Sequence, residues 1–211
     1  MAIAHTRWAT HGVPSDVNSH PHLSNDGKIA VVHNGTIDNY LDIKSDLEDE
    51  GFEFLSESDT EVIPNLISKY YEGDLVKAVS KILDEIQGIY TIAAIHVDNS
   101  EQIVSVRNET PLVIGLGNRE NYVASDIYAI LKYTQQIIYP EDHQIVSVSP
   151  NEVNVFDESL SKIEYEVETV EKYTEVAEKG GFEHFMLKEI FEQPKALQDS
   201  QTELFVNSPL D

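Results

Sequence analysis

The stretch Ala4-His5-Thr6-Arg7-Trp8-Ala9-Thr10-His11-Gly12 decides how the rest of the chain is interpreted. It holds an arginine, the chain's only tryptophan, two threonines and two histidines. In a strand, successive side chains face opposite sides, and neither side here would be a uniformly apolar face. The alternative is a strand that runs into a polar turn at Gly12-Val13-Pro14. The density of polar and aromatic side chains favours a functional site.

The composition is that of a globular protein with an acidic surface. The chain has 211 residues, of which 41% are hydrophobic, and a net charge of -24 from 38 acidic and 14 basic side chains. This length is typical of one or two domains, and the apolar fraction suffices for a core. A negative charge of this size repels nucleic acids and anionic membranes, so we expect neither as a partner.

The chain contains no cysteine. Its residues therefore offer no disulfide, no thiolate metal site and no thiol nucleophile. The opening residues lack the basic segment and long apolar run of a signal peptide, and no apolar stretch reaches membrane-spanning length. We expect a soluble, cytoplasmic protein.

The order of apolar patterns predicts an α+β fold. Helices are predicted at 38–51, 58–70, 75–86, 127–131 and 182–192. Strands are predicted at 28–33, 52–55, 90–97, 102–107, 112–116, 121–124, 135–138, 143–148, 153–156 and 163–170. Because the strands lack the regular strand-helix-strand rhythm of a parallel sheet, we expect mainly antiparallel sheets covered by helices. Asn34-Gly35 has the sequence of a tight turn, and Ser58 with Glu61 has the spacing of a capping box.

Five of the eight histidines lie near the start of the chain: His5, His11, His20, His22 and His33. We favour structural histidines over a metal site. An extended His20-Pro21-His22 would point its two rings to opposite sides, and no carboxylate stands at ligand spacing. No cofactor is expected either, because Gly115-Leu116-Gly117 lacks the third glycine and following helix of a nucleotide-binding loop.

Four residues would together suit a small zwitterion. Arg7 can pair with a carboxylate through two parallel hydrogen bonds, and Asp59 can accept an ammonium group. The side-chain amide of Asn34 and the backbone N–H of Gly35 could form an oxyanion hole. Each has a structural alternative: a surface ion pair for Arg7, a turn for Asn34-Gly35 and a helix start for Asp59. Taken together, the set favours a single binding site.

The sequence resembles the glutaminase domain of the glutamine–fructose-6-phosphate aminotransferases, which are class II glutamine amidotransferases. The matching motifs run in family order: His5 to Gly12, Asn18-Ser19-His20-Pro21-His22, Val32-His33-Asn34-Gly35, Ser58-Asp59-Thr60-Glu61, Pro111 to Gly117, Ala124-Ser125-Asp126 and His184 to Ile190. The resemblance implies the N-terminal-nucleophile hydrolase fold, an αββα sandwich in which two antiparallel sheets lie between helix layers.

The resemblance also implies a reaction. Family members hydrolyse glutamine and pass the ammonia through a channel to a sugar-isomerase domain, which makes glucosamine 6-phosphate from fructose 6-phosphate. By position, Arg7 would hold the α-carboxylate of glutamine and Asp59 its α-ammonium. Thr10 and His11 would line the glutamine pocket.

The remaining roles follow from the same resemblance. Asn34 and Gly35 would form the oxyanion hole, and Trp8 would lie at the channel entrance. Family members carry a catalytic cysteine at the mature N-terminus, whereas Met1 stands several dozen residues downstream of that position, and Ala2 cannot replace it. We therefore expect the chain to bind glutamine or glutamate and to lack turnover.

The same comparison gives the expected organisation. Residues 1–195 would form the glutaminase domain without its first strands, and 196–211 would begin a linker to the sugar-isomerase domain. The missing strands would leave an unpaired sheet edge, so we expect a homo-oligomer. One alternative is a catalytically inactive module that binds glutamine or glutamate or docks a partner. Another, a class II amidotransferase with a different acceptor, is disfavoured because 182–192 matches this family's own pattern.

Overall fold

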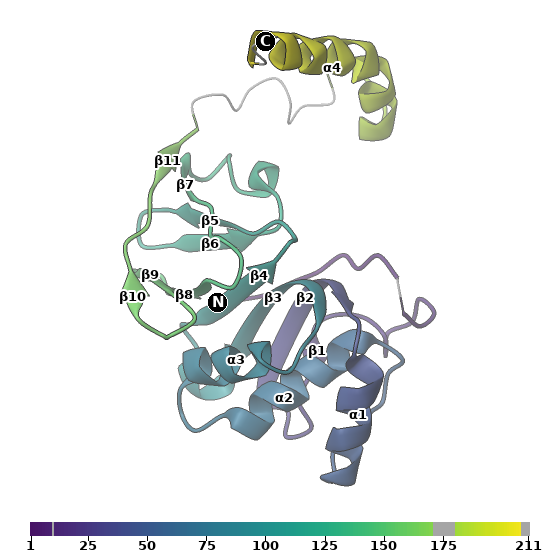
Figure 1. Ribbon diagram of the computed structural model, residues 1–211, viewed down its shortest axis with the longest axis vertical. Coiled ribbons are helices and arrows are strands. Elements are labelled where there is room, and N and C mark those ends of the chain that lie inside the picture. The colour runs from purple at the N-terminus through teal and green to yellow at the C-terminus, as the bar shows by residue number, and fades with distance from the viewer. Residues whose placement is uncertain (10, 171–179, 208–211) are drawn as a thin grey trace. The chain divides into compact units, whose positions relative to one another are not determined.

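The computed structural model describes residues 1–9, 11–170 and 180–207, and the chain divides into two compact units, Met1–Val170 and Glu171–Asp211 (Figure 1). The strands are β1 His22–Leu23, β2 Ile29–Ile37, β3 Gly88–His96, β4 Ile103–Asn108, β5 Val113–Leu116, β6 Asn121–Ala124, β7 Gln136–Ile138, β8 Ile145–Val148, β9 Val153–Phe156, β10 Lys162–Ile163 and β11 Glu168–Thr169. The helices are α1 Tyr40–Asp49, α2 Val62–Tyr70, α3 Leu75–Leu83 and α4 Phe185–Asn207, with 3₁₀ turns η1 Asp59–Glu61, η2 Val97–Asn99 and η3 Ile127–Ala129.

Among the described residues the strands form two sheets. The seven-stranded sheet has the order β1-β2-β3-β4-β8-β9-β10, and the four-stranded sheet has the order β11-β7-β5-β6. Every pair of named strands is antiparallel. The predicted α+β class with antiparallel sheets is therefore confirmed, as are the expected hairpins β3–β4 and β5–β6.

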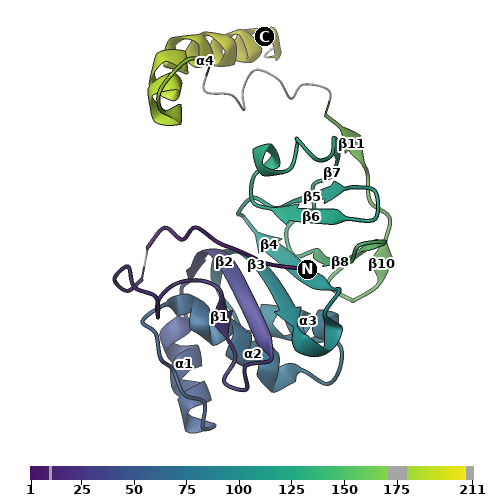
Figure 2. The same ribbon diagram turned by 180° about the vertical axis from the view of Figure 1, so that it is seen from behind.

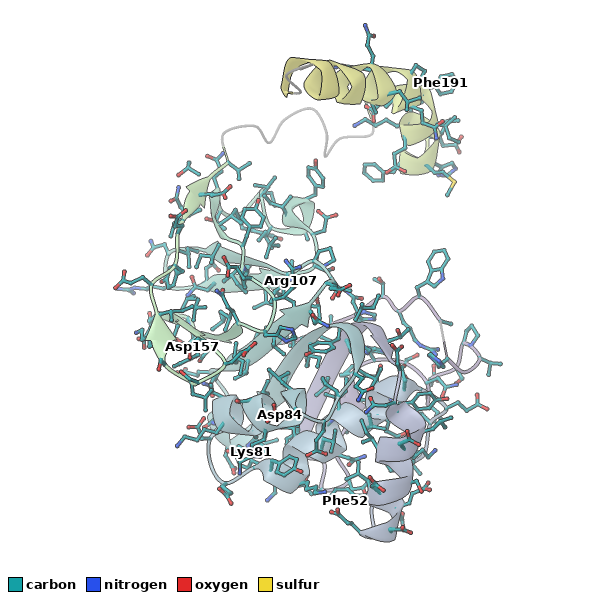
Figure 3. The ribbon with its side chains drawn as sticks, viewed as in Figure 1. Phe52, Lys81, Asp84, Arg107, Asp157 and Phe191 are labelled. Atoms are coloured by element: carbon teal, nitrogen blue, oxygen red, sulfur yellow. The ribbon has the colours of Figure 1, made fainter. Side chains whose placement is uncertain are left out.

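The first unit is layered. Helices α1, α2 and α3 cover one face of the seven-stranded sheet, as the two opposite views show (Figures 1 and 2). Helix α3 is amphipathic: Lys81 and the following Asp84 are exposed (Figure 3), whereas Ile82 is fully buried in the core against the sheet. The helix predicted at 75–86 is present and ends at Leu83, and its mix of exposed and buried positions is typical of a helix that covers a sheet.

The two sheets pack against each other through their other faces. Within β8, Ile145 belongs to the core under the helices, whereas Val146 belongs to a second core with Ile114 and Ile138 of the four-stranded sheet. Successive side chains of a strand point to opposite faces, so a fully apolar strand such as β8 must be covered on both. The outer face of the four-stranded sheet carries a third, small core around Ile137, beside η3.

Two predictions near the start of the chain need correction. The predicted turn at Asn34-Gly35 is wrong, because β2 continues to Ile37 and Gly35 pairs with Tyr90 of β3. The strand predicted at 52–55 is also wrong. There the backbone N–H groups bond to a helix end and a side chain: Phe52 donates to the carbonyl of Leu47 and Glu53 to Asn25 Oδ1.

The capping box is only half formed. Ser58 caps η1 by accepting from the backbone N–H of Thr60. The carboxylate of Glu61 does not accept from the backbone N–H of Ser58, as a full capping box requires. It accepts instead from the backbone N–H groups of Leu55 and Ser56, at 2.9 and 2.7 Å. This buried carboxylate holds the segment before η1 in place.

The last two predicted elements differ from the structure. The single strand predicted at 163–170 is two short strands in different sheets, β10 and β11, because the chain crosses from one sheet to the other between them. The helix predicted to end at Glu192 continues to Asn207 with Pro194 inside it. The ribbon of α4 is bent (Figure 1), as expected of a helix containing a proline.

Candidate active site

A cavity of about 280 Å³ lies where the N-terminal segment crosses the end of β2 and η1. Its lining joins segments that are far apart in the sequence: His5, Arg7, Trp8, His20, His33, Asn34, Gly35, Thr36, Ser58, Asp59, Thr60 and Ile89. Five of the seven predicted site residues therefore line one cavity. Of the other two, His11 contacts Asp59, and Thr10 lies outside the described residues.

Asn34 and Gly35 are positioned by strand pairing. They lie opposite Thr91 and Tyr90 of β3. Gly35 has a φ of 111°, and a Cβ there would lie 2.0 Å from the carbonyl oxygen of Ile89. Only glycine fits this conformation and this close approach. The close pairing of β2 with β3 at this point therefore requires a residue without a side chain.

Asp59 is buried and fixed between two elements. Asp59 is the first residue of η1, directly after the cap Ser58. One of its carboxylate oxygens accepts a hydrogen bond from the N–H of Ile37 at 2.9 Å. The other oxygen lies 3.7 Å from Nδ1 of His11, a buried atom that has no hydrogen-bond partner among the described residues. Buried polar atoms are normally paired. An unpaired nitrogen beside a buried carboxylate suits a site that binds a polar ligand.

Arg7 lines the cavity with a guanidinium that is already engaged. It donates to the backbone carbonyls of His11, Gly12 and Val13, and so ties the loop to the cavity wall. Arg7 itself has a φ of 42°. Trp8, next in the chain, is 90% exposed. Single exposed apolar side chains are common on protein surfaces, so this exposure by itself assigns Trp8 no role.

Asn18 is a structural residue of the site to which the sequence analysis gave no role. Its side chain donates to the carbonyl of Val13 at 2.9 Å and accepts from the N–H of Glu57 at the same distance. It therefore links the loop held by Arg7 to the segment before Asp59. The partners are 39 positions apart, so nothing local in the sequence reveals this contact.

Histidine rings at and beside the cavity contact one another. His5 stacks on His20 with ring centroids 4.3 Å apart, and His20 and His22 meet edge to face at 5.1 Å. The expectation that His20 and His22 point apart is wrong, because the backbone bends at His20 and Pro21. Among the described residues no group of three or more histidines and carboxylates is arranged to hold a metal.

Burial disfavours the protonated form of His20, His22 and His33. It lowers the pKa of His20 from 6.5 to about 3, with further lowering from His5, His22 and His33. Burial also lowers the pKa of His33 to about 4, against the raising influence of Asp59, and that of His22. Neutral rings can accept hydrogen bonds. Nδ1 of His20 accepts from the N–H of His33 at 3.2 Å.

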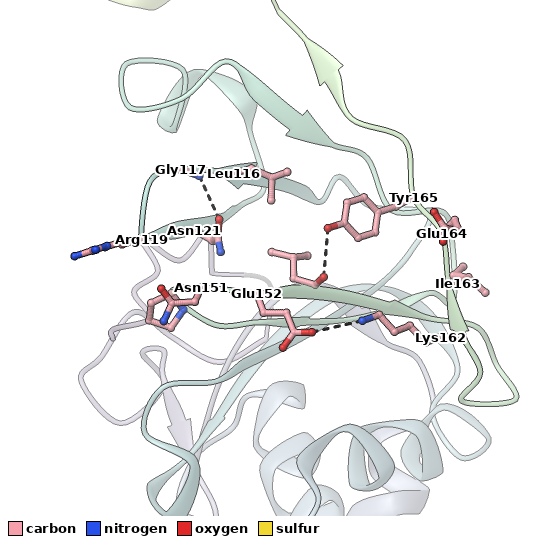
Figure 4. A pocket seen from close by; sticks show the side chains of 12 residues that line it. Leu116, Gly117, Arg119, Asn121, Asn151, Glu152, Lys162, Ile163, Glu164 and Tyr165 are labelled. Atoms are coloured by element: carbon pink, nitrogen blue, oxygen red, sulfur yellow. Dashed lines mark hydrogen bonds and ion pairs between the residues drawn. The ribbon is translucent and has the colours of Figure 1, made fainter.

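A larger cavity, of about 690 Å³, contains none of the predicted site residues (Figure 4). It is lined by the β5–β6 turn, the β8–β9 turn and β10. Two of the polar contacts at this cavity are Lys162 with Glu152 at 3.4 Å and the backbone N–H of Gly117 donating to Asn121 (Figure 4). At the end of β4, Arg107 (Figure 3) is likewise paired, with Asp142 at 2.8 Å. Neither place contains any of the residues that the sequence analysis assigned to the site.

Comparison with known proteins identifies the family. Residues 5–132 match the glutamine amidotransferase domain family. The chain belongs to this family. It is 51% identical over 207 residues to glutamine–fructose-6-phosphate aminotransferase (isomerizing) of Caldanaerobacter subterraneus, covering 98% of this chain and 34% of the relative. The enzyme of the same name from Clostridium perfringens is 50% identical over 202 residues, covering 96% of this chain and 33% of the relative. The resemblance noted from the motifs is confirmed.

Solved structures agree on the fold. A glutamine phosphoribosylpyrophosphate amidotransferase from B. subtilis superposes with a TM-score of 0.60 at 25% identity, covering 75% of this chain and 35% of that chain. An allosteric regulatory enzyme of purine biosynthesis superposes with a TM-score of 0.56 at 22% identity, covering 69% of this chain and 32% of that chain. The fold is thus that of the class II amidotransferases.

The amidotransferase chain spans about a third of the length of the curated relatives it matches. In the part of the chain that the structure describes, no helix combines the length and apolar character needed to cross a membrane.

Proposed function

We propose that this chain is the glutamine-binding part of a glutaminase that supplies ammonia for making glucosamine 6-phosphate. The observation that carries the proposal is the single cavity around Arg7, Asn34, Gly35 and Asp59. A guanidinium and a buried carboxylate on its wall provide the two opposite charges that an α-amino acid needs. Arg7 holds the α-carboxylate and Asp59 the α-ammonium group.

The remaining site residues act on the side-chain amide of glutamine. In the proposed reaction a thiolate attacks the amide carbon, and the oxygen becomes negative as the tetrahedral intermediate forms. The Asn34 amide and the Gly35 N–H stabilise that oxygen. The α-amino group of the cysteine, which took the thiol proton, returns it to the amide nitrogen, so that ammonia leaves and water then hydrolyses the thioester to glutamate. By the resemblance, Thr10 and His11 would belong to the glutamine pocket and Trp8 would mark the exit of the ammonia.

The nucleophile is not among the 211 residues, which contain no cysteine. We assign it to a cysteine at the start of a segment preceding Met1, as in the family that the motifs resemble. That segment would also supply the strands that complete the αββα sandwich. Residues 1–195 would then be the glutaminase domain, and 196–211 would lead toward a sugar-isomerase domain that takes up the ammonia within a homo-oligomer.

The decisive experiment measures glutamate release from glutamine by two proteins. One is the 211-residue chain, and the other is the same chain extended upstream to begin with the expected cysteine. We expect turnover only in the extended protein, and its loss on Arg7→Ala. Turnover by the unextended chain that is abolished by Arg7→Ala would show that the chain carries its own nucleophile, against the proposal.

The absence of cysteine favours one other function, a binding module without chemistry. Titration calorimetry of glutamate into both proteins separates the two. Binding by both proteins without turnover in either would favour the module. Turnover in the extended protein would exclude it.

A further inference from the structure

His5 occupies a position between the two halves of the proposed site. Its Nε2 lies 2.7 Å from Oδ1 of Asn34, and its Nδ1 accepts a hydrogen bond of 2.9 Å from the backbone N–H of Arg7. The ring therefore joins the residue that would bind the α-carboxylate to the residue that would stabilise the oxyanion. We propose that His5 is a positioning residue that orients the Asn34 side-chain amide for the oxyanion hole.

The argument begins with the tautomer. A backbone N–H can only donate, so Nδ1 of His5 must carry a lone pair to accept from Arg7. A neutral imidazole then has its proton on Nε2. Since Nε2 faces Oδ1 of Asn34, which can only accept, the contact of 2.7 Å is a hydrogen bond donated by His5.

The consequence is an assigned direction for the amide. With Oδ1 of Asn34 occupied by His5, the Nδ2 group is the end that remains to donate to a substrate oxygen. An amide free to rotate by half a turn would present Oδ1 instead, and an oxygen would repel the developing negative charge. His5 removes that second orientation before the reaction begins, which is how preorganised oxyanion holes act.

The ring of His5 is itself held in place. It stacks on His20 at a centroid distance of 4.3 Å and an interplanar angle of 17°. His20 is fixed in turn by the N–H of His33 in β2, the strand that carries Asn34. The positioning group and the group that it orients are therefore anchored to the same strand.

Two substitutions of His5 separate its two hydrogen bonds. His5→Gln places an amide N–H near the position of Nε2 and can keep the bond to Asn34. His5→Asn is shorter and places its oxygen near Nδ1, so that it can keep only the bond to Arg7. Both are made in the upstream-extended protein, and glutamine hydrolysis is measured. We expect His5→Gln to stay within about threefold of the wild-type kcat and His5→Asn to lower kcat by about 10- to 100-fold, both with little change in KM.

A double-mutant cycle tests whether His5 acts through Asn34. Asn34→Ala removes the group that His5 orients, so adding His5→Asn to it should lower kcat by less than about threefold further. A multiplicative further loss would overturn the proposal, and so would equal effects of His5→Gln and His5→Asn or a loss confined to KM.

This inference rests on the proposed function, and the two fail differently. If the extended wild-type protein does not release glutamate, the proposed function fails. If it does and both His5 variants match it, only the role of His5 is wrong.

Discussion

One carboxylate oxygen of Asp59 accepts a hydrogen bond from the backbone N–H of Ile37 at 2.9 Å. This contact joins η1 to the end of β2, the strand that carries Asn34 and Gly35. A buried carboxylate bonded to a backbone N–H is held firmly in place. The proposed site for an ammonium group and the proposed oxyanion hole are therefore held at a fixed separation, which would match the two ends of one substrate.

Asp59→Asn tests the charge of this carboxylate apart from its structural contact. The amide oxygen can still accept from Ile37, so we expect the free energy of unfolding to change by less than about 1 kcal/mol. The loss of charge should weaken glutamate binding by about 10- to 100-fold, because hydrogen bonds to charged groups contribute about 1.5–3 kcal/mol. Titration calorimetry gives the affinity and urea unfolding the stability.

The matched control is Asp26→Asn, since Asp26 also accepts a backbone N–H, from Lys28, but is exposed and lines no part of the cavity. Unchanged affinity in Asp59→Asn, or an equal loss in the control, would contradict the role of Asp59.

Gly35→Ala should be strongly destabilising. The added Cβ would meet the carbonyl oxygen of Ile89 at 2.0 Å, and φ is 111°. We expect the free energy of unfolding in urea to fall by about 3 kcal/mol or more. Gly27→Ala is the control, because φ there is also positive, at 68°, but nothing lies within 4 Å of the added Cβ. It should cost only about 1–2 kcal/mol. Equal losses would mean that the close approach at Gly35 relaxes freely.

The fold was predictable where an apolar run is uninterrupted. Strand β3, Gly88–His96, differs from the predicted 90–97 only at its ends, because its side chains are apolar and must be buried. Asn34-Gly35 was mistaken for a turn because turn propensity is local, whereas pairing with β3 depends on residues more than fifty positions away. The continuation of α4 through Pro194 was missed for a similar reason: proline normally ends a helix.

The candidate site was predictable as a set of residue types and unpredictable as a geometry. The motif around Arg7, Asn34 and Asp59 could be found because these side chains suit an amino acid. That Arg7 would bond to the carbonyls of its own loop, and that Asn18 would fasten this loop to Glu57, depends on tertiary contacts. No spacing in the sequence encodes these contacts.

Arg7→Lys follows from that loop geometry. The planar guanidinium donates to three successive carbonyls, and a single ammonium group cannot keep this arrangement while also pairing with a carboxylate. We expect glutamate affinity to fall by at least about tenfold although the charge is retained. Titration calorimetry measures the affinity for glutamate, and Lys28→Arg serves as a control on an exposed residue outside the cavity. Wild-type affinity in Arg7→Lys would show that charge alone suffices.

The buried histidines should make stability depend on pH. His33 is 4% exposed, and burial lowers its pKa from 6.5 to about 4. Below about pH 6.5 the unfolded chain takes up a proton at this position and the folded chain does not, so stability falls as the pH falls and the loss levels off below about pH 4. Between about pH 7.5 and pH 5 this residue alone should lower the free energy of unfolding by about 2 kcal/mol.

Urea unfolding of His33→Gln tests this expectation. The loss of unfolding free energy over this pH range should be smaller by that amount in His33→Gln, whereas His184→Gln, at an exposed position, should behave like the wild type. Identical pH dependence in His33→Gln and the wild type would mean that His33 takes up its proton in the folded protein as readily as in the unfolded chain.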